Sequence, residues 1–419
     1  MSDYKPYIVS WNVTKRCNLL CPHCYIDSTA RLEQNNSELT TEEARHVIDE
    51  LSYINDRLML VLSGGEPLLR RDIYEIIEYA SSGGFIPVLG TNGILLTKEV
   101  VSLLKEAGLR GVGVSIDSVN PEEHDRFRGF DGAWELSVSG LRYAREAEIE
   151  TQLDVTLTDR NYQEIDRFIE FGVGLGVKAI NFFFLICTGR AMKTDISTDN
   201  YESALRHVAS RTFKEKRLMV RARCAPHIYR VLYEDGYSIP AGTRGCLAGR
   251  SYMRIDPEGY VTPCPYMPVI AGNIRESSLS DIWEGASYLR LLREGNYKGR
   301  CGICEYTEIC GGCRARALVN SGDMMDEDSL CGYVPEGKGK VTVEMKETSD
   351  LKWDERAKER IKNVPTFMRN MIVRMIESKA RKKGIDTITS GFIDELKKVG
   401  YSHGYKKIME IGGDDGRTD

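Results

Sequence analysis

The amino-acid sequence predicts an α/β protein with three parts: a partial (β/α)6 TIM-type barrel, a small cysteine-rich domain and an α-helical tail. Two observations lead to this prediction. Six β-rich runs alternate with helix-periodic segments before residue 215, which is typical of βαβ units that form a parallel sheet. Nine of the 12 cysteines lie in two groups, three near the start and six between residues 246 and 313.

The barrel is predicted from the order of its elements. Thr, Asp or Asn stands at the start of several helical segments as an N-cap, and Gly ends several of them as a C-cap. A complete eight-unit barrel takes about 250 residues, more than this part of the chain provides, so we expect six units. The expected strands are residues 7–13, 58–62, 86–90, 112–116, 151–157 and 179–185.

The rest of the chain has a different composition. Residues 216–336 lose the alternation and gain Cys, Gly and Pro, which indicates a small domain organised by metal. Residues 337–349 are typical of a linker, and two or three amphipathic helices are expected after it. The predicted domains are therefore residues 1–215, 216–336 and 350–400.

The overall composition excludes several classes of protein. Of the 419 residues, 42% are hydrophobic and 28% are charged, as in ordinary soluble domains. No window approaches the ~20 apolar residues that cross a bilayer, and the first residues do not form a secretion signal. The net charge of −5 argues against a nucleic-acid partner. We expect a cytoplasmic protein without a membrane span, whose cysteines bind metal and do not form disulfides.

Unusual polar or Gly-rich stretches follow the predicted strands. The first strand is followed by three cysteines, the second by SGGEP (63–67), the third by GTNG (90–93) and the fourth by SID (115–117). In barrels and open α/β folds, this carboxyl end of the sheet carries the active site.

The three early cysteines have the spacing Cys17-x3-Cys21-x2-Cys24. Three thiolates on one short loop can ligate three irons of a 4Fe–4S cluster and leave the fourth iron open to a small molecule. The alternative is zinc, which usually takes four ligands in two pairs and fits this loop poorly.

With Tyr25 behind it, this motif resembles the radical S-adenosylmethionine (SAM) superfamily, which implies a 4Fe–4S cluster and SAM. SGGEP looks like the motif of that family whose backbone, here at Gly64, Gly65 and Glu66, meets the SAM amino group. Gly permits the close backbone approach that such a contact needs.

Two more residues resemble SAM-binding positions of related enzymes. Ser115 and Arg128 look like residues that hold the SAM ribose and carboxylate, and Arg suits a bidentate carboxylate contact. The alternative for Arg128 is a solvated helix charge. Asn92 and Asp117 are expected to support the same site.

The second cysteine group is similar to the SPASM domain, an auxiliary iron–sulfur module. The resemblance implies one cluster on Cys301, Cys304, Cys310 and Cys331, although the last cysteine pair of the run is spaced x2 where x3 is usual. A second cluster would lack an obvious fourth ligand, for which Cys224 is a candidate, so one or two auxiliary clusters are expected. Zinc is the alternative. The remaining implied ligands are Cys246, Cys264 and Cys313.

Longer phrases, among them RCNLLCPHCYID and TPCPYMPV, look like the haem-biosynthesis branch of these enzymes over residues 7–335. They look most like didecarboxysiroheme deacetylases, which implies removal of acetate side chains from 12,18-didecarboxysiroheme to give Fe-coproporphyrin III by way of a 5′-deoxyadenosyl radical. The alternatives are oxidative decarboxylation of Fe-coproporphyrin III propionates to haem b, and peptide modification. The implied partners are a tetrapyrrole and a low-potential electron donor such as ferredoxin or flavodoxin.

Three further points concern single segments. Residues 353–389 resemble a small helical domain of light-independent protochlorophyllide reductase, and the alternative is a basic helical cap without a ligand.

His227 is expected to be packed or exposed; the alternatives are iron ligation and substrate contact. A non-enzymatic iron–sulfur carrier is disfavoured because it would not need SGGEP, Ser115 or Arg128. The tail's basic residues are Arg369, Arg374, Lys379, Arg381, Lys382 and Lys383.

Overall fold

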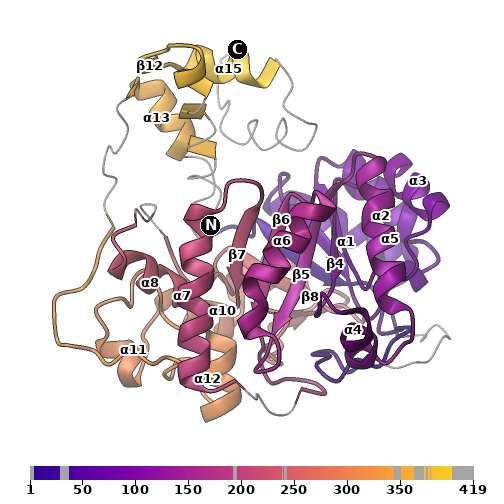
Figure 1. The fold of residues 1–419 in the computed structure, drawn as a ribbon, viewed down its shortest axis with the longest axis horizontal. Coiled ribbons are helices and arrows are strands. Elements are labelled where there is room, and N and C mark those ends of the chain that lie inside the picture. The colour runs from indigo at the N-terminus through magenta and orange to yellow at the C-terminus, as the bar shows by residue number, and fades with distance from the viewer. Residues whose placement is uncertain are drawn as a thin grey trace.

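A computed structural model describes the chain at residues 4–28, 37–191, 196–237, 239, 243–343, 351–362, 372–373, 376–377 and 379–398 (Figure 1). The predicted α/β class and all six predicted strands are confirmed. These strands pair in parallel in the order of the chain. They are β1 (Ile8–Asn12), β2 (Met59–Ser63), β3 (Ile86–Thr91), β4 (Gly111–Ser115), β5 (Glu150–Leu157) and β6 (Ala179–Phe184).

Two further parallel strands come from the part of the chain that we assigned to the second predicted domain. β7 (Met219–Arg223) pairs with β6, and β8 (Tyr252–Ile255) pairs with β1. The short antiparallel strands β9 (Tyr260–Thr262) and β10 (Gly272–Asn273) complete a ten-stranded sheet in the order β10-β9-β8-β1-β2-β3-β4-β5-β6-β7. One continuous sheet therefore contains strands from both sides of the predicted boundary at 215–216. The domain limits stay predictions.

Helices follow the strands and cover one face of the sheet. Local signals fix their ends: Thr40 and Glu43 form a capping box at the start of α1, and Gly176 in the left-handed region ends α6. The helices are α1 (Thr41–Ile54), α2 (Ile73–Ser82), α3 (Lys98–Glu106), α4 (Pro121–Arg128), α5 (Ala133–Glu146), α6 (Ile165–Leu175) and α7 (Thr198–Lys214), with the 3-10 turns η1 (Pro67–Leu69) and η2 (Tyr162–Glu164).

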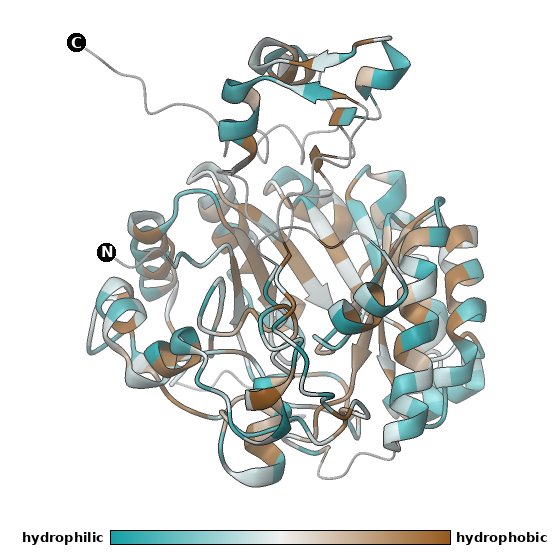
Figure 2. Cartoon of the chain, turned by 90° about the vertical axis from the view of Figure 1, so that its left-hand side faces the viewer, coloured by the Kyte–Doolittle hydropathy of each residue, from teal (hydrophilic) through white to brown (hydrophobic). Residues whose placement is uncertain are grey.

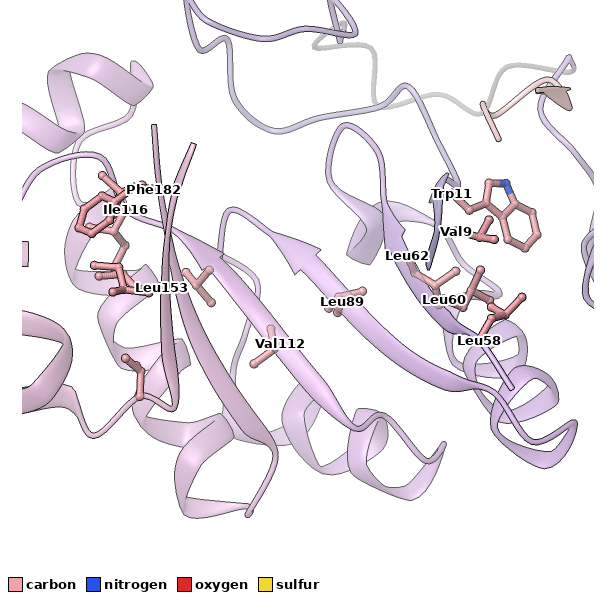
Figure 3. Close-up of a cluster of buried hydrophobic side chains, with 14 of the residues drawn as sticks. Val9, Trp11, Leu58, Leu60, Leu62, Leu89, Val112, Ile116, Leu153 and Phe182 are labelled. Atoms are coloured by element: carbon pink, nitrogen blue, oxygen red, sulfur yellow. The ribbon is translucent and has the colours of Figure 1, made fainter. Parts of the chain in front are cut away.

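The two faces of the sheet differ because successive side chains of a strand point to opposite sides. One face is apolar and packs against the helices, and Figure 3 labels some of its buried side chains, such as Leu60, Leu89 and Val112. Figure 2 shows hydrophobic strands inside a layer of helices that also carry hydrophilic residues. The other face forms the inside of the open barrel.

The second part of the chain is anchored to the barrel through the sheet and through Trp283. The indole of Trp283 is buried, donates from Nε1 to the Tyr4 carbonyl oxygen at 2.8 Å, and lies 4.4 Å from the guanidinium of Arg293. The helices of this part are α8 (Ile228–Glu234), α9 (Leu279–Gly285), α10 (Ser287–Glu294), α11 (Gly299–Ile303) and α12 (Arg314–Ser321).

The tail forms a small body at one end of the molecule (Figures 1 and 2). It is helical as predicted, with α13 (Glu355–Lys362) and α15 (Ser390–Lys398). It also contains a parallel pair that we did not predict, β11 (Lys352–Trp353) and β12 (Thr387–Ile388). Its apolar cluster, which includes Ile388, packs against Ile86 at the start of β3.

The predicted basic helix of the tail is described only in part. Arg369 and Arg374 lie outside the described residues. Arg381 forms an ion pair with Glu377 at 3.8 Å, and Lys383 forms one with Glu395. Two of the basic side chains are thus compensated within the tail. Among the described residues, no helix is both long and apolar enough to cross a membrane.

Candidate active site

The loop after β1 brings the three early cysteines together with polar donors. The Leu19 amide donates to Cys17 Sγ at 3.4 Å, and the Ser28 amide donates to Cys24 Sγ at 3.4 Å. Arg128 Nη1 donates to Cys21 Sγ at 3.6 Å. Donors to sulfur favour the thiolate form, which is the form that binds metal.

SGGEP lies directly against this cysteine loop. The Gly65 amide donates to the Thr14 carbonyl at 2.8 Å, and the Glu66 amide donates to the Arg16 carbonyl at 2.7 Å. A Cβ atom on Gly65 would lie 2.0 Å from the Arg16 oxygen, and one on Gly64 would lie 2.5 Å from the Thr14 oxygen. Glycine is therefore needed at both positions. Two N–H groups of this turn already donate within the chain. An ammonium group donates hydrogen bonds, so the carbonyl oxygens of the turn are the atoms that suit such a ligand.

The side chain of Glu66 holds the ends of β2 and β3 together. It is fully buried and accepts from Thr91 Oγ1 at 2.8 Å and from the Asn92 amide at 3.0 Å. Burial raises its pKa to about 7, although these donors oppose the rise. The Asn92 side chain in turn donates from Nδ2 to Asn18 Oδ1 at 2.8 Å. Asn92 thus joins the GTNG loop to the cysteine loop.

Arg128 and Asp117 form a buried ion pair beside the same loop. Arg128 Nη2 lies 2.5 Å from Asp117 Oδ2, and Arg128 is only 7% exposed, so it is not a solvated helix charge. Burial raises the pKa of Asp117, but the Arg128 charge outweighs it and holds that pKa below its usual value. Arg128 Nε is buried without a hydrogen-bond acceptor among the described residues. This donor is therefore left unsatisfied within the described part of the chain.

Ser115 and Tyr25 lie on the inner side of the barrel. Ser115 ends β4 and is paired in register with Asp154 of β5. The Tyr25 hydroxyl accepts from Asn12 Nδ2 at 2.9 Å, and its ring lies 5.0 Å from the ring of Tyr266. Tyr25 therefore joins the cysteine loop to the second part of the chain.

The inner face of the barrel is polar, which we did not predict. The Asn181 amide links two charged groups: its Nδ2 donates to Asp154 Oδ1 at 2.6 Å, and its Oδ1 accepts from Arg223 Nε at 3.1 Å. Ordinary barrels fill this space with apolar layers. Partly buried polar side chains here indicate a chamber for a polar ligand. They include Ser63, Ser115, Gln152, Asp154, Thr156, Arg223 and Arg254.

Four of the later cysteines line one pocket, and His227 and Arg230 line it as well. These four are the cysteines grouped by the sequence resemblance. Burial raises the pKa of Cys331 to about 11 in the free thiol. The four cysteines are Cys301, Cys304, Cys310 and Cys331.

Cys224 lies with the other three. It has a left-handed backbone (φ 57°) directly after β7, and it packs against the same apolar cluster as Cys246, Cys264 and Cys313. Burial raises the pKa of Cys224 to about 12, and the neighbouring thiols of Cys313 and Cys246 add to the rise. The chain therefore presents two sets of four cysteines in its second part.

Buried charges lie between these two sets. Asp328 accepts from the Cys313 amide at 2.7 Å and from Arg316 Nη1 at 2.8 Å. His227 is buried, as one of our expectations allowed; its Nδ1 is 2.8 Å from the Tyr201 hydroxyl and its Nε2 is 3.5 Å from Asp328. These contacts fix the positions of His227 and Asp328 between the two sets of cysteines.

The geometry fits iron–sulfur clusters better than the zinc alternative. No three His, Cys, Asp or Glu side chains in the described part of the chain converge closely enough to hold one metal ion. A four-iron cluster is wider than a single ion and takes its thiolates further apart. Three thiols on one loop and two sets of four suit such clusters.

Models of three protein families match the chain. They are the radical SAM superfamily at residues 11–172, the SPASM iron–sulfur cluster-binding domain at 246–314 and the proto-chlorophyllide reductase 57 kD subunit at 353–397. Each match lies within one of the three predicted domains.

Two relatives whose names refer to haem formation match most of the chain. An "AdoMet-dependent heme synthase" of Methanosarcina barkeri is 42% identical over 79% of this chain and 97% of its own length. An "Fe-coproporphyrin III synthase" of the same organism is 31% identical over 80% of this chain and 90% of its own length. Streptococcus suis SuiB bound to S-adenosylmethionine matches with a TM-score of 0.64 at 16% identity, over 79% of this chain and 78% of its own. That likeness shows the fold.

Proposed function

We propose that this chain, which belongs to the radical SAM superfamily and within it to the SPASM-bearing enzymes of haem biosynthesis, converts Fe-coproporphyrin III to haem b. The observation that carries this choice is the 42% identity to a haem synthase over 97% of that relative. Acetate removal from 12,18-didecarboxysiroheme, which we predict from the sequence, is the second candidate. The relative at 31% identity supports it.

The reaction would act on two propionate side chains. Each would lose one hydrogen atom, one electron and carbon dioxide, and would leave a vinyl group. SAM on a reduced cluster supplies the 5′-deoxyadenosyl radical that accepts the hydrogen atom. The electron from each side chain would need an oxidised acceptor, and an auxiliary cluster held by the later cysteines would supply one.

The chain's residues would bind SAM at the carboxyl end of the sheet. Cys17, Cys21 and Cys24 would hold the first cluster. The carbonyl side of the SGGEP turn would accept from the SAM ammonium, and the unpaired Arg128 Nε would meet its carboxylate. Asp117 would keep Arg128 charged and in place. Ser115 would contact the ribose from the end of β4, and Asn92 would hold the cysteine loop.

We assign two auxiliary 4Fe–4S clusters to the second part of the chain. One set is Cys301, Cys304, Cys310 and Cys331, which line one cavity. The other is Cys224, Cys246, Cys264 and Cys313, which pack together and shift one another's pKa. A soluble low-potential carrier, such as ferredoxin or flavodoxin, would supply the electron that SAM cleavage consumes.

Replacing Cys224 tests the second set. Three 4Fe–4S clusters hold about twelve irons per chain, so Cys224→Ala should lower the iron content to about eight. Cys187→Ala is the matched control, because Cys187 belongs to neither set, and it should keep all the iron. Iron and sulfide analysis of anaerobically purified protein makes this measurement. Equal iron contents together with identical cluster spectra in the two variants would remove Cys224 from the ligands.

The function is tested by anaerobic turnover with both macrocycles. The reconstituted protein is given SAM and dithionite with either Fe-coproporphyrin III or 12,18-didecarboxysiroheme, and mass spectrometry follows the products. Haem b and 5′-deoxyadenosine from the first substrate are the expected result. Fe-coproporphyrin III formed from the second substrate would establish acetate removal instead. If 5′-deoxyadenosine forms while both macrocycles stay intact, both proposals fail and a peptide substrate becomes the next to test.

A further inference from the structure

We propose that Arg223 and Arg254 are the carboxylate-binding residues of the barrel chamber, and that they hold carboxylate side chains of the tetrapyrrole. This inference rests on the proposed function, because it takes an anionic macrocycle as the ligand. It goes beyond that function by naming the two side chains that recognise the substrate.

Both arginines lie on the inner face of the barrel. Arg223 ends β7 and shares a face with Asn181, to which it donates. Arg254 lies on β8 and donates from Nε to Asn12 Oδ1 of β1 at 2.6 Å. β7 and β8 are the two edges of the parallel part of the sheet. The two arginines therefore flank the chamber from its two edge strands.

The two guanidinium groups are held in the same way. In each, an asparagine oxygen accepts from Nε, which fixes the plane of the group and leaves its Nη atoms for another acceptor. A guanidinium held in this way can donate two parallel hydrogen bonds to a carboxylate.

Neither arginine has a carboxylate partner in the described part of the chain. Several other arginines with little exposure do have one, whereas the buried Arg314 donates instead to backbone carbonyl oxygens. Arg128 pairs with Asp117 at 2.5 Å, Arg230 with Glu202 at 2.5 Å, and Arg316 with Asp328 at 2.8 Å. A charge with little exposure is costly unless it is paired. The missing anions at Arg223 and Arg254 are therefore best supplied by a ligand.

Asp154 does not fill this role for Arg223. Asn181 stands between them, since its Nδ2 donates to Asp154 while its Oδ1 accepts from Arg223. The amide thus keeps the protein's own carboxylate apart from the guanidinium. Fe-coproporphyrin III carries four propionates, so two of them can be held while the chemistry takes place on others.

Binding of the macrocycle to the holoprotein, measured by absorption titration without SAM, tests the inference. Fe-coproporphyrin III should bind about tenfold more weakly to Arg223→Gln and to Arg254→Gln, and about a hundredfold more weakly to the double variant. Arg167→Gln, which removes a charge on the exposed surface of α6, should bind like the wild type. The tetramethyl ester of the same macrocycle should bind all variants equally. Iron analysis of each variant shows whether its clusters are intact before binding is compared.

Two results would overturn the inference. One is wild-type affinity of the double variant for Fe-coproporphyrin III. The other is an equal loss for the ester, which would show that the substitutions disturb packing and not charge recognition. If the wild type binds only didecarboxysiroheme, and the arginine variants weaken that binding, the inference stands and the proposed haem synthesis fails. If the wild type binds neither macrocycle, both fail.

Discussion

At the scale of single residues, two glycines determine how closely the SGGEP turn approaches the cysteine loop. Gly64 has a φ of 151°, and a Cβ atom on Gly65 would overlap the Arg16 carbonyl. The cysteine loop and the SGGEP turn therefore share one contact surface. Small changes there should affect both cofactors together.

Gly65→Ala should lower the stability of the protein by at least about 1–3 kcal/mol, because backbone atoms must move to admit the methyl group. The variant should also lose SAM cleavage. Gly174→Ala on α6 is the matched control, because no atom lies within 4 Å of its added Cβ. It should stabilise by about 0.5–1 kcal/mol, since helical Gly is costly. Denaturant unfolding and 5′-deoxyadenosine formation measure both effects, and a stable, active Gly65→Ala protein would contradict this reading of the turn.

Burial of His124 should make the stability of the folded protein depend on pH. This histidine is buried, its Nδ1 accepts from the Asp117 amide at 3.2 Å, and burial lowers its pKa from 6.5 to about 4. Between these values the unfolded chain binds a proton that the folded chain does not. Stability should therefore fall as the pH falls from 6.5 to 4, by up to about 1.4 kcal/mol per pH unit from this residue.

His124→Asn keeps a hydrogen-bond acceptor and removes the titrating group. Urea unfolding at several pH values should show a shallower loss of stability in this variant than in the wild type. His46→Asn, at an exposed position of α1, should leave the slope as it is. Identical slopes for wild type and His124→Asn would show that His124 titrates normally in the folded protein.

At the scale of elements, the sequence predicts local signals well and misses pairings between distant segments. The first six strands, the cysteine loop and the SGGEP turn follow from apolar runs and spacing within short windows. β7 and β8 were not predicted because arginines interrupt their short apolar runs, Arg221 and Arg223 in β7 and Arg254 in β8. The grouping of Cys224 with the SPASM cysteines also depends on tertiary packing.

The inner face of the barrel shows what a closer reading could have found. In ETQLDVTL, the residues Gln152, Asp154 and Thr156 alternate with the buried Leu153 and Val155. That period of two predicts a strand with one polar face. An interior that is polar in a predicted barrel indicates a ligand chamber. Which distant arginine faces which asparagine requires the structure.

At the scale of the whole molecule, the tail forms a small body of its own. It has its own apolar cluster, which contacts the barrel through Ile86. A relative named as a haem synthase is matched over 97% of its length by 79% of this chain. We therefore expect the radical SAM and SPASM parts to carry out the proposed reaction without the tail.

A chain that ends at residue 343 should keep its iron content and its SAM cleavage. Contact with the tail is lost at Ile86, so a modest fall in melting temperature is the only expected change. Iron analysis and 5′-deoxyadenosine formation, compared with the full chain, provide the measurement. Loss of SAM cleavage in the soluble truncated protein would assign the tail a part in cofactor binding.

The central claim is that a propionate side chain of a macrocycle held in the chamber gives up a hydrogen atom. Fe-coproporphyrin III with deuterium on its propionate chains tests this claim most directly. Mass spectrometry of the 5′-deoxyadenosine formed with the full protein should show one deuterium per molecule, together with haem b. Unlabelled 5′-deoxyadenosine accompanying an unchanged macrocycle would contradict the account.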